Sequence, residues 1–248
     1  MRRTGIVWIC VWLLGAGLIL ADVAAAQAPS AASIAIGGRL YDNWWKEGAG
    51  KAPTGDHPMW ARQSTNKGKG ATTWRCKECH GWDYRGKDGV YGSGSHFTGF
   101  PGITSVNARS VDQSLKMLTD PSHGFVSIVN GTHGTHLVNF LKHGLVDLST
   151  VIDRKTKKPV KADEARGKQS FALCAGCHGP DGKLRNFGKP DDPEYVGTVA
   201  RENPWEFVHK VRFGQPGSNP PMPSGIDLGW SLEDVLNILA YSQTLPEK

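Results

Sequence analysis

Two short cysteine–histidine segments constrain this chain more than any other feature. "CKECH" spans Cys76–His80 and "CAGCH" spans Cys174–His178, so the second begins 98 residues after the first. The two segments hold four of the five cysteines, and the fifth, Cys10, lies in an apolar run near the N-terminus. Such strict spacing predicts that the two cysteines and the histidine of each segment act together on one bound group.

The 98-residue offset extends beyond these two segments. It carries "LVNFLKHG" at Leu137–Gly144 onto "VLNILAYS" at Val235–Ser242, and both have apolar residues at helical spacing. A glycine-led stretch with helical character precedes each segment, at Gly37–Trp45 and at Gly167–His178. In the first half, an insertion of about 30 residues at Glu47–Arg75 separates the two features. The sequence therefore predicts two copies of one helical unit.

The N-terminus has the composition of an export signal. Arg2 and Arg3 precede the apolar run, and small residues at Ala24–Ala26 predict cleavage. An uncleaved membrane anchor is the alternative, since Thr4–Ala21 is 18 residues without a charge. We expect a periplasmic protein, in contact with the membrane only through this segment if it is not cleaved. The expected divisions are a signal peptide at 1–26, a first domain at 27–150, a linker at 151–163 and a second domain at 164–248.

C-x-x-C-H is the attachment motif of c-type haem. Two thiols three positions apart can add to the two vinyl groups of a porphyrin, and the adjoining histidine offers its imidazole to the iron. Zinc is the nearest alternative, but one zinc held by both cysteine pairs would leave His80 and His178 without a role. A thioredoxin-like pair needs a βαβ pattern, which is not found. We therefore predict two covalently attached haem c groups, held by Cys76, Cys79, Cys174 and Cys177 and ligated by His80 and His178.

With these motifs the chain resembles c-type cytochromes made of two fused class I haem domains. The likeness is best in the second half, through "CAGCHGPDGK", "ENPWEFVHKVRFGQPGSNPPMPSG" and "SLEDVLNILAYSQTL". The resemblance implies an all-α fold of two tandem domains, each a few helices wrapped around a covalently bound haem, with loop-rich insertions in the first. The haem would supply core that so small a domain cannot build alone.

The resemblance also locates the sixth ligand of each iron. In the second domain it implies Met222, which follows His178 by 44 residues in the proline-rich loop "NPPMPSG". The first domain has no methionine at the equivalent place, but His123 in "DPSHGF" lies one residue away from it. Ligation of the first iron by both His80 and His123 is therefore the leading prediction. It would give a lower reduction potential than methionine–histidine ligation.

Several other residues are weaker candidates for contact with a haem or its iron. Met117 is the second choice, but it lies in a stretch with helical periodicity and is expected in the core. An empty sixth position is a further alternative. His143 and His209 are expected to be ordinary residues of amphipathic helices, and Arg212 is placed equally at a haem propionate or in solvent. Three more histidines are expected at the surface or in hydrogen bonds: His96, His133 and His136.

Two unequal haems predict an electron carrier that exchanges single electrons with a donor and an acceptor protein. The carrier could be the electron-accepting subunit of a dehydrogenase. No nucleophile–base pair or carboxylate pair is visible, so no catalytic residue is predicted. The alternative function is a haem enzyme, thiosulfate-oxidising or peroxidase-like, with the first haem as its active site. Basic residues cluster only at Arg154–Lys158, so no nucleic-acid partner is predicted.

Overall fold

The computed structural model describes residues 28–129 and 131–248. Within these ranges the chain is helical and contains no β-strand, which confirms the all-α class. Its only β-type pairings there are two isolated bridges, Gly86 with Pro101 and Ile152 with Pro159. None of the helices described is both long and apolar enough to cross a membrane. The predicted export signal at 1–26 lies outside the described residues.

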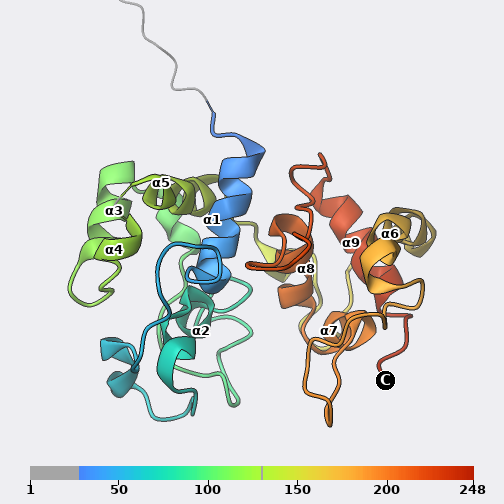
Figure 1. Cartoon of the computed structure of the whole chain (residues 1–248), viewed down its shortest axis with the longest axis horizontal. Coiled ribbons are helices and arrows are strands. Elements are labelled where there is room, and N and C mark those ends of the chain that lie inside the picture. The colour runs from blue at the N-terminus through green and yellow to red at the C-terminus, as the bar shows by residue number, and fades with distance from the viewer. Residues whose placement is uncertain (1–27, 130) are drawn as a thin grey trace, which may run out of the picture.

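The first half of the chain forms the group of helices on the left of Figure 1. Short helical turns fill the insertion before the first cysteine segment, at Pro58–Arg62 and Gly70–Trp74. Three further short turns lie at Thr104–Ala108, at Phe140–Gly144, where the helix is of the π type, and at Leu148–Thr150. The α-helices of this half are α1 (Ala31–Asn43), α2 (Cys76–His80), α3 (Val111–Thr119), α4 (Val126–Val129) and α5 (Thr132–Asn139).

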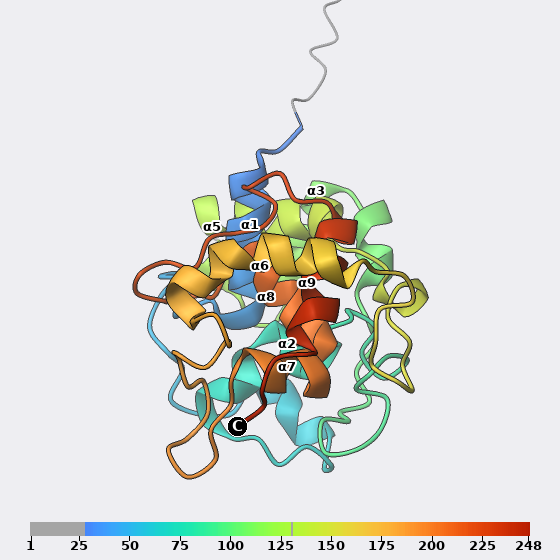
Figure 2. The same ribbon diagram turned by 90° about the vertical axis from the view of Figure 1, so that its right-hand side faces the viewer.

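The second half forms the group on the right of Figure 1. Seen from that side, α6 lies across the outer part of this half, with α9 packed against it (Figure 2). Helix α8 lies between α9 and the first half, where it meets α1. The α-helices of this half are α6 (Glu164–His178), α7 (Val196–Glu202), α8 (Pro204–Phe213) and α9 (Leu232–Ser242).

The same helix pair recurs in both halves, as the offset of 98 residues predicts. Helix α1 packs on α5 and its π-helical continuation, and α6 packs on α9. Each leading helix has a glycine where the closing helix crosses it. A β-carbon at Gly37 would collide with the carbonyl oxygen of His136, and one at Gly167 with that of Asn237. Only glycine permits backbones to approach this closely.

Local capping explains where these helices begin. The side chain of Asp163 accepts a hydrogen bond from the backbone N–H of Arg166 at the start of α6, at 3.0 Å. Ser231 and Asp234 form a reciprocal capping box at the start of α9. Asn203 caps α8, whose first residue is Pro204, and proline is well suited to a first helical position. The predicted stretches that begin at Gly37 and Gly167 therefore start inside α1 and α6, which begin a few residues earlier.

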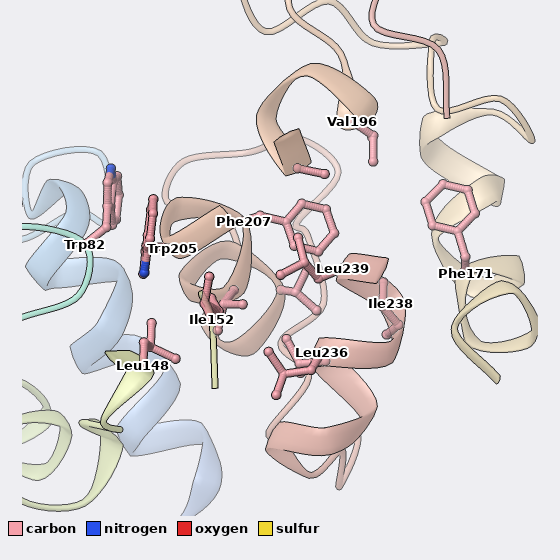
Figure 3. Close-up of a cluster of buried hydrophobic side chains, with 14 of the residues drawn as sticks. Trp82, Leu148, Ile152, Phe171, Val196, Trp205, Phe207, Leu236, Ile238 and Leu239 are labelled. Atoms are coloured by element: carbon pink, nitrogen blue, oxygen red, sulfur yellow. The ribbon is translucent and has the colours of Figure 1, made fainter. Parts of the chain in front are cut away.

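The apolar cores of the two halves are shared rather than separate. The core of the second half includes Trp82, Tyr91 and Leu148 from the first half. Figure 3 shows Trp82 beside Trp205 of α8, with Leu148 and Ile152 below them. The core of the first half in turn includes Phe213 from the end of α8. The segment expected as a linker, 151–163, begins inside this core, since Ile152 is buried.

His209 on α8 is a buried residue of the contact between the halves. Its Nδ1 accepts a hydrogen bond from the Tyr84 hydroxyl at 2.8 Å, and its Nε2–H donates to the Gly38 carbonyl at 2.9 Å. Burial lowers the pKa of His209 to about 3, so the ring is neutral. His209 lies on a helix, as expected, but the helix face that carries it is buried against the other half. Periodicity places a residue on a helix face but does not say which neighbour covers that face.

Asp42 at the end of α1 is a second polar link across this contact. Its carboxylate is buried and forms ion pairs with Arg75, directly before the first cysteine segment, and with Lys210 on α8. Arg75 also donates from Nε to the Asp42 carbonyl at 2.8 Å. Burial alone would raise the pKa of Asp42, but Lys210 and then Arg75 outweigh it and hold the pKa well below its usual value. Arg212 is also buried and donates to the Gly144 carbonyl at 2.8 Å.

Candidate functional site

The first cysteine segment is a single helical turn, α2. Cys76 and Cys79 lie one turn apart on it with free thiols, and His80 is its last residue. Gly81 ends the turn in a left-handed conformation, with a φ of 77°, and its N–H bonds to the Lys77 carbonyl at 2.9 Å. The two cysteines and the histidine are therefore held on one helical turn, and the chain leaves the helix immediately after His80.

The second cysteine segment is the last turn of α6. Cys174 and Cys177 again have free thiols, and His178 is the last helical residue. Gly179 ends the helix with a φ of 81° and bonds to the Ala175 carbonyl at 2.9 Å. The two segments thus have the same local geometry, although one stands alone and the other ends a long helix. Because the segment geometry is repeated, the two sites are expected to hold the same kind of group.

Three of the thiols in the two cysteine segments are held uncharged by burial. Burial raises the pKa of Cys76 and of Cys79 to about 12, and that of Cys174 to about 11. A reactive cysteine needs a lowered pKa, since the thiolate is the nucleophile. These environments therefore do not suit a thiol–disulfide redox pair.

His80 has the partner that a metal-ligating imidazole needs. Its Nδ1 lies 2.7 Å from the Pro101 carbonyl oxygen, so Nδ1 carries the proton and Nε2 is left unprotonated. The bridge between Gly86 and Pro101 holds this carbonyl in place. Burial also lowers the pKa of His80 to about 4, which keeps the ring neutral. The acceptor is a backbone atom, and no side-chain pattern in the sequence could have identified it.

The structure brings His80 and His123 together. The centroids of their imidazole rings are 6.4 Å apart, and the ring planes differ by only 18°. Parallel rings in face contact would lie about 3.5–4.0 Å apart, so these two are separated by a gap. Two imidazoles on one metal, with metal–nitrogen bonds of about 2.0–2.1 Å, have centroids roughly 6 Å apart. The spacing therefore fits a single iron between the two rings.

Two of the ring nitrogens at these sites are buried without a protein partner. They are Nδ1 of His123 and Nδ1 of His178. Burial lowers the pKa of both histidines, so both rings are neutral. A buried polar atom without a hydrogen bond is rare and costly. A metal bound at Nε2 would not satisfy these Nδ1 atoms, so the fit to two haems rests on the neutral histidines, His80 and His178, that end the two cysteine segments.

Met222, the predicted sixth ligand of the second iron, lies in the loop between α8 and α9. It is half-buried and packs against the core of the second half, as does Cys174. Its backbone N–H donates to the Ser218 hydroxyl at 2.8 Å. Further along the loop, the Ser224 hydroxyl donates to the Arg212 carbonyl at 3.0 Å. The loop that carries Met222 is therefore fixed to α8 by hydrogen bonds, which would hold a weak thioether ligand in position.

The weaker candidates for the first site have other partners. Met117 lies on α3 and packs against the core of the first half, as its helical periodicity predicts. The His96 ring stacks on Tyr91 at 4.7 Å. His133 and His136 lie within α5. Nδ1 of His136 lies 2.8 Å from the Ser33 hydroxyl oxygen.

His57 contacts a predicted site residue, a contact that the sequence does not reveal. It lies in the insertion Glu47–Arg75, in a setting rich in glycine, lysine and proline and without a motif. In the structure its Nε2 is 2.9 Å from the carbonyl oxygen of His123. The insertion therefore packs directly on the proposed ligand of the first iron.

The comparisons with known proteins do not identify the chain. No protein-family model matches it, and neither does a curated protein or a solved structure. In the part of the chain that the structure describes, no three His, Cys, Asp or Glu side chains gather as a site for a metal ion. The functional conclusion therefore depends on the two cysteine segments and on the geometry around them.

Proposed function

We propose that this chain is a periplasmic c-type cytochrome with two haems, which transfers single electrons between a donor and an acceptor protein. The observation that carries this proposal is the pairing of His80 with His123, at the spacing of one shared iron, beside the thiols of the first cysteine segment. The repeat of that segment at the end of α6 supports a second haem. The haem supplies an iron that alternates between the ferrous and ferric states.

The residues of the chain divide into two different ligand sets. Cys76 and Cys79 would attach the first haem, and His80 and His123 would hold its iron. Cys174 and Cys177 would attach the second haem, and His178 and Met222 would hold its iron. Methionine–histidine ligation raises the reduction potential above that of two histidines. The two sites would therefore have unequal potentials, which suits directed transfer through the molecule.

Two protein ligands for each iron would favour a carrier over a haem enzyme. An enzyme that oxidises thiosulfate or reduces peroxide at the first haem needs an open or displaceable sixth position. His123 is held in its turn by two backbone hydrogen bonds, from His123 N–H and Gly124 N–H to the Asp120 carbonyl at 3.0 and 2.9 Å. A carrier, by contrast, needs only that each iron keep its ligands in both oxidation states.

A redox titration of the holoprotein is expected to resolve two one-electron couples, with the first-domain haem at the lower potential. Because both irons would have two protein ligands, carbon monoxide is expected to bind slowly to the reduced protein as isolated. The titration is followed by visible absorbance, and ligand binding by the Soret shift. Two equal high potentials would contradict the bis-histidine assignment. Prompt binding of carbon monoxide would favour the enzyme.

Met222→Ala is expected to abolish the weak near-infrared band that arises from the sulfur-to-iron bond of the ferric protein. The spectrum of the first haem should not change, because Met222 packs with the core of the second half. Met117→Ala is the matched control, since Met117 is also a half-buried methionine but belongs to the first half. Retention of the band in Met222→Ala, or its loss in Met117→Ala, would show that the ligand assignment is wrong.

A further inference from the structure

The insertion Glu47–Arg75 has no counterpart in the second half. Its one histidine is His57. His57 is buried and caps the short helical turn at Pro58–Arg62. Its backbone N–H donates to the Thr73 hydroxyl at 2.8 Å, which ties the start of the insertion to its end. The Thr73 hydroxyl in turn donates to the Gly70 carbonyl at 2.7 Å. The position of the His57 ring is therefore fixed by the insertion itself.

The hydrogen bonds of His57 determine its tautomer. Its Nδ1 accepts a hydrogen bond from the Met59 backbone N–H at 3.1 Å, so Nδ1 carries no proton. The proton of the neutral ring is then on Nε2. Nε2–H points to the carbonyl oxygen of His123, at 2.9 Å, and donates to it. Both ring nitrogens of His57 are therefore engaged, which leaves it unsuited to bind a metal and suited to hold a neighbour.

Aromatic packing holds the same turn from the side. The His57 ring lies 4.5 Å from Trp74 and 5.6 Å from Phe125 between centroids, and Trp74 is itself 6.0 Å from Phe125. The indole N–H of Trp74 donates to the Gly55 carbonyl at 2.8 Å. Phe125 follows His123 by two residues, across Gly124, which has a φ of 67°. The insertion thus contacts the turn at the His123 carbonyl and at Phe125.

We propose that His57 is a positioning residue, whose hydrogen bond to the His123 carbonyl keeps the His123 imidazole facing His80. This inference rests on the proposed function, because it assumes that His123 ligates the first iron. On this view the insertion closes the sixth position of that iron. The second half has no such insertion, and there the proline-rich loop around Met222 is fixed to α8 instead. One neutral hydrogen bond changes an equilibrium by about 2- to 12-fold, so the loss of this bond should open the sixth position to that extent.

The test compares two substitutions in the full-length holoprotein. His57→Phe keeps an aromatic ring against Trp74 and Phe125 but removes the donor, whereas His57→Gln keeps an N–H donor and loses the ring. We expect cyanide to bind the ferric first haem about 2- to 12-fold more tightly in His57→Phe. The midpoint potential of the first couple should shift, and His57→Gln should behave as the parent. His143→Phe is the control, because His143 is exposed and lies after α5.

Each outcome supports or overturns the inference. Parent-like cyanide binding in His57→Phe overturns it, as does an equal change in His57→Gln, because the ring would then act by filling space. If neither variant accumulates with two haems, His57 serves folding and the inference is overturned. If only His57→Gln accumulates, the donor role is supported. His123→Ala tests the proposed function separately: if it leaves cyanide binding and the first potential unchanged, His123 is not a ligand, whatever the His57 variants do.

Discussion

Asp42→Ala is expected to lower the free energy of unfolding by about 3–5 kcal/mol. The Asp42 side chain is fully buried, and its substitution would leave Arg75 and Lys210 as two largely buried cations without their shared partner. Uncompensated buried charge costs more than the ion pairs themselves contribute. Denaturant unfolding followed by far-ultraviolet circular dichroism measures the change. The loss would act on both halves, because the three residues come from α1, from the position directly before the first cysteine segment and from α8.

Glu233→Ala is the control for this prediction. Glu233 pairs with Arg166 at 3.7 Å, but about two thirds of each side chain is exposed, and such surface pairs contribute about 0–1 kcal/mol. A change for Asp42→Ala no larger than that for Glu233→Ala would contradict the assignment. The pH dependence gives a second check. Because the folded pKa of Asp42 is depressed, its contribution is full above the unfolded value of 3.8 and is lost as the pH falls below it. In Asp42→Asn the free energy of unfolding should depend less on pH over this acid range.

Substitution of both cysteines of one segment by serine is expected to remove one haem and leave the other. The Cys174→Ser, Cys177→Ser protein, made in a host that attaches haem c, should contain one haem per chain where the parent contains two. Its redox titration should retain only the lower couple. The reason is that each segment would form both thioether bonds of one haem. The mass of the intact chain and its haem content per polypeptide measure the result.

The reciprocal variant completes the experiment. Cys76→Ser, Cys79→Ser should also contain one haem, with only the higher couple and with the near-infrared band of Met222 retained. The two variants are matched, since each removes two thiols from an equivalent helical turn. A parent protein at its bare polypeptide mass would refute the haem assignment entirely. Two haems in either variant would show that attachment does not follow the segments.

The helix pairs were predictable from the sequence because they depend on local patterns. Apolar spacing locates α9 and the α5 region, and the glycine-led stretches locate α1 and α6. The all-α class was implied by the resemblance to c-type cytochromes. The pairing of His123 with His80 could also be predicted, since the repeat limits the ligand to one short stretch. In each case the signal is a spacing along the chain, which folding preserves.

The contact between the halves was not predictable in this way. Trp82 and Phe213 join the core of the opposite half, and no periodicity records which half will cover them. His209 reads as an amphipathic helix residue, although its partners Tyr84 and Gly38 lie far away in the sequence. The contact of His57 could not be predicted for the same reason, because its partner is a backbone carbonyl 66 residues later. Residues that act through distant backbone atoms leave no local signal.

The shared cores have a consequence for how electrons would move within the molecule. Trp82 lies two residues after His80 and beside Trp205, so the first cysteine segment is joined to α8 through buried aromatic rings. With haems bound, the two irons would be kept at one separation rather than sampling a range of distances. Exchange between them would then proceed at a single intrinsic rate, insensitive to solvent viscosity. Docking of the partner proteins would limit the overall rate of electron transfer, because no hinge between the halves would need to close first.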